Sequence, residues 1–174
     1  MSLLGEVIAT GEKALVFTQF REMGRLLTAM IQHDLDCETM FLHGGTPTRR
    51  RQQFIDRFQD ENGGVPVFIL SLKAGGVGLN LTAANHVFHY DRWWNPAVEN
   101  QATDRAFRIG QLKTVHVHKF VCTGTLEERI DQMIEQKMEL ADNIVGSGEK
   151  WMSELTAGQL REMLVLRDSA LETD

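Results

Sequence analysis

The chain has 174 residues, which is the length of one domain and enough to bury a proper core. No apolar run is long enough to span a membrane and no tract is of low complexity, so those protein classes are excluded. The net charge is −6 and the sequence pI is about 5.5, whereas a free-standing nucleic-acid-binding protein is usually basic.

Apolar, β-rich runs alternate with amphipathic segments along the chain. After the end of a helix at residues 4–9, strands are predicted near residues 14–18, 38–42, 65–70, 86–90 and 114–121. This alternation predicts an α/β fold, a mostly parallel sheet flanked by helices, with functional groups at the carboxyl ends of the strands. Helix starts are predicted at Thr46 before Pro47, at Asn95 before Pro96, and at the capping boxes Thr125 to Glu128 and Thr156 to Gln159.

A glycine-rich loop follows the apolar run 65–70. Glycines at 75, 76 and 78 let the backbone approach a phosphate or ribose closely, with bare amides as donors. Such a loop is weak evidence alone, because most are simply tight turns.

Further along the chain, residues 101–111 place Arg105 and Arg108 three apart, which predicts two guanidinium groups on one helical face. A guanidinium is always charged and presents a rigid fork of donors, so the pair suits the charge that builds on a phosphoryl group during transfer. An isolated pair with this spacing would more often be two solvated helix arginines.

Four ordered segments together resemble the motifs of the SWI/SNF-type ATPases, the double-stranded-DNA translocase branch of helicase superfamily two. Residues 13–20 resemble motif IV, residues 42–58 motif IVa, and residues 68–111, which include Trp94-Asn95-Pro96, motifs V and VI. The tail from Gly124, with residues 125–130, is similar to the closing helices of bacterial members. The resemblance covers nearly the whole chain and implies a RecA-like motor lobe at residues 1–141, followed by a linker and a brace-like helix at 142–174.

The Walker A loop that cradles the nucleotide phosphates and the acidic motif that holds Mg²⁺ are both missing. Residues 11–14 lack the Gly-Lys-Ser/Thr order, with Lys13 opening a strand, and residues 60–63 are expected to form a turn. The resemblance therefore implies the second lobe of a two-lobed motor. ATP and Mg²⁺ would be held mainly by the absent N-terminal lobe, and the isolated lobe is expected to have no ATPase activity.

The resemblance also implies a role for individual residues. Arg105 and Arg108 would be catalytic arginine fingers, with Gln101 and Asp104 orienting their helix, although a plain surface role for these two is nearly as well supported. The nucleotide side would use Gly76, Gly78, Asn80 and Asp104. Contacts to the DNA backbone would come from Thr18, Gln19, Phe20, Gly44, Gly45, Arg51, Ser71, Lys73, Trp94 and Asn95.

Charge and residue type qualify these roles. Residues 40–110 hold eight basic and six acidic residues, so the motif-bearing centre is positive while both flanks are negative. Lys73 stands where many members have arginine, and His43 where many have aspartate. Asn95 could instead merely cap the helix that begins at Pro96.

The remaining candidate groups are expected to be structural. Cys37 and Cys122 are predicted to be two buried thiols rather than a disulfide or metal pair. The strand histidines lack ligand spacing, so no metal site is expected; they are His86, His89, His116 and His118.

The implied partners are double-stranded DNA, the N-terminal lobe and DNA-bound protein such as polymerase. A cytoplasmic, nucleoid-associated location is expected in a bacterium and a nuclear one in a eukaryote. Two alternatives stay open: the lobe of a strand-separating helicase, and a non-catalytic α/β interaction module.

Overall fold

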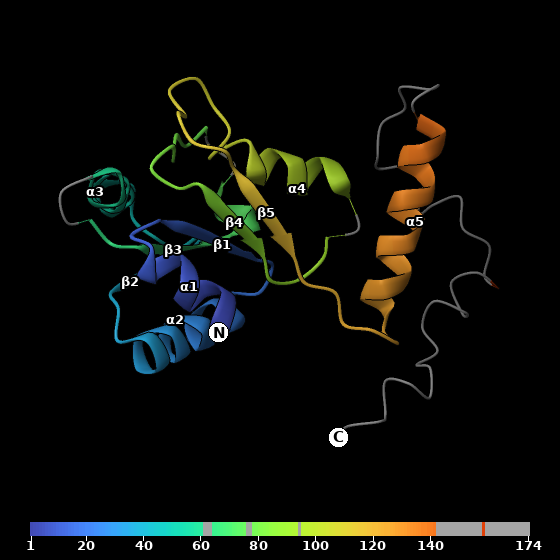
Figure 1. Cartoon of the computed structure of the whole chain (residues 1–174), viewed down its shortest axis with the longest axis horizontal. Coiled ribbons are helices and arrows are strands. Elements are labelled where there is room, and N and C mark those ends of the chain that lie inside the picture. The colour runs from blue at the N-terminus through green and yellow to red at the C-terminus, as the bar shows by residue number, and fades with distance from the viewer. Residues whose placement is uncertain (61–63, 76–77, 94, 142–157, 159–174) are drawn as a thin grey trace. The chain divides into compact units, whose positions relative to one another are not determined.

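The computed structural model describes residues 1–60, 64–75, 78–93, 95–141 and 158 (Figure 1). The chain divides into two compact units. Unit 1 comprises Met1–Tyr90 and Asn100–Lys119, and unit 2 comprises Asp91–Glu99 and Phe120–Asp174. The predicted boundary at residue 141 and the segment 142–174, apart from Gly158, lie outside the described residues. Among the described residues, no helix has the length and apolar character needed to cross a membrane.

Unit 1 is built on one five-stranded sheet whose neighbouring strands are all parallel, in the order β2-β3-β1-β4-β5. The strands are β1 Ala14–Thr18, β2 Thr39–Leu42, β3 Val67–Ser71, β4 His86–His89 and β5 His116–Lys119. β1 and β3 are buried along their whole length, as their continuous apolar runs predict for strands covered on both faces. The expected α/β sheet is therefore confirmed, with each strand within the range predicted or one residue beyond it.

Helices cover both faces of this sheet. In unit 1 these are α1 Ser2–Ala9 and α2 Arg21–Leu35 on one face and α3 Thr48–Gln59 on the other. The short 3₁₀ helix η1 Leu72–Gly75 also belongs to unit 1, α4 Pro96–Thr103 begins in unit 2 and ends in unit 1, and α5 Leu126–Ala141 belongs to unit 2. Side chains alternate along β1, so Ala14 and Val16 join the core beneath α1 and α2. Leu15 and Phe17 join the opposite core with Phe58 of α3. Figure 1 shows α1 and α2 together on one side of the strands.

Gly24 lets α2 lie close to the sheet. A Cβ atom built on Gly24 would stand 2.3 Å from the ring of Phe41 on β2, so no larger residue fits without a shift. Lys13 caps the end of α3, because its Nζ donates to the carbonyls of Phe58 and Asp60. Lys13 immediately precedes β1 rather than opening it.

Three local predictions need correction or refinement. Thr46 does not cap α3, whose N-cap is Pro47, because the Thr46 hydroxyl accepts the His43 N–H instead. Thr125 does cap α5 by accepting the Glu127 N–H. The matching Glu128 carboxylate accepts the N–H of Gly124 rather than that of Thr125. The second capping box, Thr156 to Gln159, lies outside the described residues.

The two cysteines were correctly predicted to be free thiols, but the prediction that both are buried was wrong. Cys37 and Cys122 are both free thiols, but Cys122 is exposed and Cys37 only half-buried. Burial is the largest cause that raises the pKa of Cys37, and a hydrogen bond with Glu127 is the largest for Cys122. Both thiols are therefore held in the less reactive protonated form.

A chain of polar contacts joins the start of the sheet to its β5 edge. His86 Nε2 lies 2.8 Å from Glu12 Oε2, and His86 Nδ1 lies 3.2 Å from His118 Nε2. Asn85 donates to the other Glu12 oxygen at 2.6 Å. The His118 ring also stacks on Phe88 with 4.4 Å between centroids. The hydrogen bond from His86, followed by that from Asn85, lowers the pKa of Glu12, whereas burial and then the charges of His86 and His116 lower the pKa of His118.

These two shifts predict that acid destabilises the chain in two steps. A lowered folded-state pKa contributes stability above the unfolded value and loses it as the pH falls toward the folded value. Stability should therefore fall first below about pH 6.5 through His118, and again below about pH 4.5 through Glu12. Each unit of pKa difference is worth about 1.4 kcal/mol.

Urea unfolding across this pH range tests the prediction. His118→Asn should shrink the first step and Glu12→Gln the second, while each variant leaves the other step in place. Equal pH dependence in wild type and both variants would contradict it.

Candidate functional site

The parallel strands bring several predicted DNA-binding residues to one edge of the sheet. Thr18 at the end of β1 is in register with Ser71 at the end of β3, and the His43–Thr46 turn follows β2 beside them. Thr18 and Ser71 are both buried, and the Thr18 hydroxyl accepts the N–H of Phe20 at 3.3 Å. Thr18 therefore shapes the turn into α2, and the exposed ring of Phe20 stands at that turn.

The remaining motif IV and V residues are only partly defined. Gln19 is half-buried beside Phe20. The backbone of Lys73 lies in η1, directly after β3, so it too starts from this edge of the sheet. Gly76 lies outside the described residues, while Gly78 and Asn80 are both exposed.

Arg51 contacts the turn that precedes α3, and its predicted contact with DNA stays a prediction. Its Nε donates to the Thr46 carbonyl at 2.9 Å and its Nη2 to the Gly44 carbonyl at 3.1 Å. Two of its donors therefore hold the turn that precedes α3.

The same turn is closed by three further contacts. The N–H of His43 donates to the Thr46 hydroxyl at 3.1 Å, and the N–H of Thr46 returns to the His43 carbonyl at 2.9 Å. The N–H of Gly45 donates to Nδ1 of the His43 ring at 3.1 Å. Burial first, and then the positive charges of Arg21, Arg25 and Arg51, lower the pKa of His43. Sequence reasoning noticed His43 only as a departure from the family pattern and missed this contact.

Arg105 and Arg108 do not lie on a helical face, which corrects the prediction. α4 ends at Thr103, and residues 104–110 form successive turns. The helical i→i−4 pattern breaks at Arg105, whose N–H binds the Ala102 carbonyl at 3.3 Å, and the Ala106 N–H binds the Thr103 carbonyl at 3.0 Å. Two tertiary contacts hold the turns that follow. The Leu81 N–H binds the Arg105 carbonyl at 2.9 Å, and the Gln111 side chain binds the Ala106 carbonyl at 3.1 Å.

The two arginines differ in environment. Arg105 is only 5% exposed, whereas Arg108 is exposed. The Arg108 Nη1 donates to the Gly78 carbonyl at 3.3 Å. Burial, and then the charge of Arg108, lower the pKa of Arg105. A guanidinium stays protonated despite such a shift, so two positive charges stand close together beside the glycine-rich segment.

Gln111 fixes this turn and was not predicted as a functional residue. Its Nε2 donates to three carbonyls, those of Thr82, Ala84 and Ala106, at 2.8 to 3.1 Å. Its Oε1 accepts the N–H of Lys113. One side chain thus joins the segment after the glycine loop to the turn that carries both arginines.

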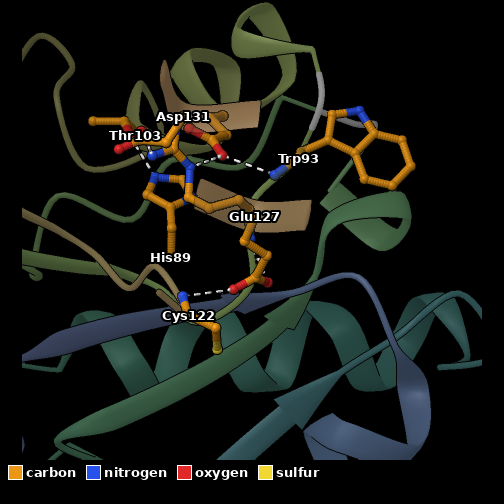
Figure 2. Close-up of polar contacts among 8 residues, drawn as sticks. His89, Trp93, Thr103, Cys122, Glu127 and Asp131 are labelled. Atoms are coloured by element: carbon orange, nitrogen blue, oxygen red, sulfur yellow. Dashed lines mark hydrogen bonds and ion pairs between the residues drawn. The ribbon is translucent and has the colours of Figure 1, made fainter. Parts of the chain in front are cut away.

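The helix residues before the arginines show a simpler picture. Gln101 and Asp104 are exposed, at the last turn of α4 and just beyond it. Thr103 is anchored from behind, since its hydroxyl lies 3.0 Å from Nε2 of the buried His89 (Figure 2). Gln101 and Asp104 are therefore accessible to solvent, and their predicted roles at the nucleotide site stay predictions.

In unit 2, Asn95 caps α4. Its Oδ1 accepts the N–H of Ala97 at 3.0 Å, and Asn95 is buried. The helix cap that the sequence analysis gave as the alternative role of Asn95 is therefore confirmed. Trp94 lies outside the described residues. Neighbouring Trp93 is half-buried, and its N–H donates to Glu99 at 2.9 Å (Figure 2).

A buried ionic network holds this segment to α5 within unit 2. The Arg92 guanidinium pairs with Glu99 at 3.0 Å, with both side chains at most 2% exposed, and also with Asp131 of α5. Glu127 of α5 accepts the N–H groups of Arg92 and Cys122, the latter visible in Figure 2. Arg92 therefore joins Glu99 of α4 to Asp131 of α5, which no sequence spacing could indicate.

Comparison with known proteins shows close relatives. Residues 1–110 match the family described as the helicase conserved C-terminal domain. The putative ATP-dependent helicase/translocase YwqA of Bacillus subtilis is 49% identical over 170 residues, covering 98% of this chain and 18% of that protein. The chain thus spans less than a fifth of the length of this curated relative.

Two solved structures are similar to this chain in both sequence and fold. The Sulfolobus solfataricus SWI2/SNF2 ATPase core in complex with dsDNA is 42% identical, with a TM-score of 0.77, covering 96% of this chain and 35% of that one. The C-terminal domain of the same ATPase is 39% identical, with a TM-score of 0.72, covering 96% of this chain and 67% of that one.

The Arg92 network predicts a large loss of stability when it is broken. Arg92→Met should lower the free energy of unfolding by about 3–5 kcal/mol, because Glu99 would remain buried without its cation. The matched control is Arg57→Met, which removes an exposed pair with Glu38 and should cost at most about 1 kcal/mol. Urea titration of both variants measures the difference, and equal losses would show that the network is not a stabilising anchor.

Proposed function

The chain belongs to the SWI2/SNF2-type ATP-dependent helicases as their C-terminal, RecA-like α/β lobe, and on this premise we propose that it is the second motor lobe of a double-stranded-DNA translocase. In this proposal the lobe supplies arginine fingers and DNA-backbone contacts to a nucleotide site that it shares with an N-terminal lobe. The motor would remodel or displace DNA-bound protein such as polymerase.

The observation that carries the proposal is the pair Arg105 and Arg108 on a turn fixed by Leu81 and Gln111. Preorganised positive charge stabilises a transferring phosphoryl group without reorganisation at the moment of reaction. Arg108 is exposed and already rests on the Gly78 carbonyl, so it can exchange that weak contact for a phosphate oxygen. Arginine fingers of this kind contribute about 10³ to 10⁵ in turnover.

The surface around Arg108 supports contact with another protein domain. Three large apolar side chains on the same turn are strongly exposed: Phe107 at 68%, Ile109 at 101% and Leu112 at 97%. Several exposed apolar side chains close together indicate an interaction surface, whereas a single one needs no explanation. The N-terminal lobe that would present ATP to the arginines is the partner we assign to this surface.

Mg²⁺ belongs to that partner in the proposal. Within the part of the chain that the structure describes, no group of three or more histidine, cysteine or acidic side chains is placed to hold a metal ion. This lobe would therefore contribute cationic charge and leave the metal, which bridges and neutralises the nucleotide phosphates, to the other lobe.

The DNA contacts would lie at the carboxyl edge of the sheet. The Gly44–Gly45 turn, Ser71 and the start of η1 meet there, within the positively charged centre of the sequence. The similar archaeal ATPase core has been solved with dsDNA, which supports duplex as the ligand. Backbone-phosphate contacts position a protein without reading sequence, so the motor would move along any duplex.

Mechanism follows from dividing one site between two lobes. Engagement of Arg105 and Arg108 with the nucleotide would close the lobes, and release after hydrolysis would open them. The Gly44–Gly45 edge would bind and release the DNA backbone in step with this cycle, and the duplex would advance. The arginines and the DNA edge both belong to unit 1, so one movement of that unit would serve chemistry and transport.

The arginine assignment predicts that Arg108→Ala in the two-lobed parent protein lowers DNA-stimulated ATPase activity by about 10³ or more while ATP binding is retained. Arg105 is buried, so Arg105→Lys is the matching variant that keeps the charge and removes the fork. Steady-state hydrolysis with and without duplex measures both, with the isolated lobe as the blank and Arg57→Ala as the surface control.

Near-normal turnover in Arg108→Ala and Arg105→Lys would overturn the assignment. It would favour the non-catalytic interaction module, whose contact surface would then be the apolar side chains around Arg108.

A further inference from the structure

The amide of Gly45 is already engaged in the structure. Its N–H donates to His43 Nδ1 at 3.1 Å, and a ring nitrogen accepts a hydrogen bond only when it carries no proton. The proposed function assigns this amide to a DNA phosphate. The phosphate and the imidazole therefore compete for one donor.

The rest of the turn cannot move aside easily. Arg51 binds the carbonyls of Gly44 and Thr46, and Thr46 exchanges two hydrogen bonds with His43. A Cβ atom built on Gly44 would meet nothing within 4 Å, so the outer side of the turn is open to a ligand. The ring of His43 is the part that can change its bonding without breaking the turn.

The charges acting on this ring come from the two helices packed beside it. Arg21 and Arg25 lie on α2, where Arg25 is paired with Glu22, and Arg51 lies on α3. Together with burial they lower the pKa of His43, so the ring is neutral in the ligand-free chain at neutral pH. An anion placed here would reverse this effect, since it would stabilise the protonated ring.

We propose that His43 couples the binding of a DNA phosphate at the Gly44–Gly45 turn to the uptake of one proton. The proton comes from solvent and binds Nδ1, which changes from acceptor to donor and releases the Gly45 N–H. The Nδ1–H and the Gly45 N–H then both donate to the phosphate. This inference rests on the proposed function, because it takes the DNA backbone as the ligand of this edge.

Proton uptake fixes the direction of the pH effect. Affinity rises as the pH falls from the His43 pKa in the complex to its lower value in the free chain, and levels off below that. One coupled proton changes the dissociation constant by at most about tenfold per pH unit.

The test uses the full chain, a short duplex and constant ionic strength, with fluorescence anisotropy from about pH 8 to about pH 5.5. His43→Asn is the informative variant, because the asparagine Oδ1 can accept the Gly45 N–H but does not titrate. His33→Asn is the matched control, since His33 is an exposed histidine beside Asp34 in the last turn of α2. NMR titration of the His43 ring with and without duplex gives a direct second measurement.

The expected result is tighter binding at low pH in wild type and His33→Asn, a flat profile in His43→Asn, and a His43 pKa that rises when duplex is added. Duplex binding with the same pH dependence in wild type and His43→Asn, or with no shift of the His43 pKa, overturns the inference and leaves the proposed function standing. Failure of every variant to bind duplex at low salt overturns the proposed DNA contact itself.

Discussion

The parallel hydrogen bonding of β1 to β3 and β4 is the constraint on which the candidate site depends. β1 is buried throughout, so its peptide groups can be satisfied only by the strands on either side. Because all three strands point the same way, their carboxyl ends open at one edge, where Thr18 stands beside Ser71. The Tyr90 N–H extends the pairing by binding the Phe17 carbonyl. Strand direction, more than any single polar residue, gathers the motifs.

The sequence was sufficient for the fold because the central strands β1 and β3 are continuous apolar runs and the strands are short and separated by clear breaks. It was misleading for Arg105 and Arg108, since a spacing of three suits a helix and a series of turns equally well. In the structure the i→i−4 pattern breaks at Arg105, and Leu81 and Gln111 hold the turns that follow by binding the carbonyls of Arg105 and Ala106. Tertiary hydrogen bonds of this kind override local propensity and have no local signature.

The polar partners of the site were the hardest part to predict. Arg92 pairs with Asp131 and Glu12 with His86, yet each pair is far apart in sequence and consists of ordinary surface residue types. The two hydrogen bonds of Arg51 to backbone carbonyls were likewise not foreseen from its family position, and its DNA contact stays a prediction. His43 was noted only as a departure from the family pattern, and its contact with the Gly45 N–H was missed. Of the two roles considered for Asn95, the helix cap is confirmed, since the following proline marks the helix start, while the DNA contact stays a prediction.

The three hydrogen bonds from Gln111 have a mechanical meaning. They tie the backbone at Thr82 and Ala84, which precede β4, to the Ala106 carbonyl. The turn that carries Arg105 and Arg108 is therefore held to the sheet. Such a carrier has little freedom to swing toward a nucleotide as a hinged loop would. On the proposed function, unit 1 would carry the arginines and the sheet together, so the step along the duplex would follow from rotation of this unit rather than from the reach of a loop.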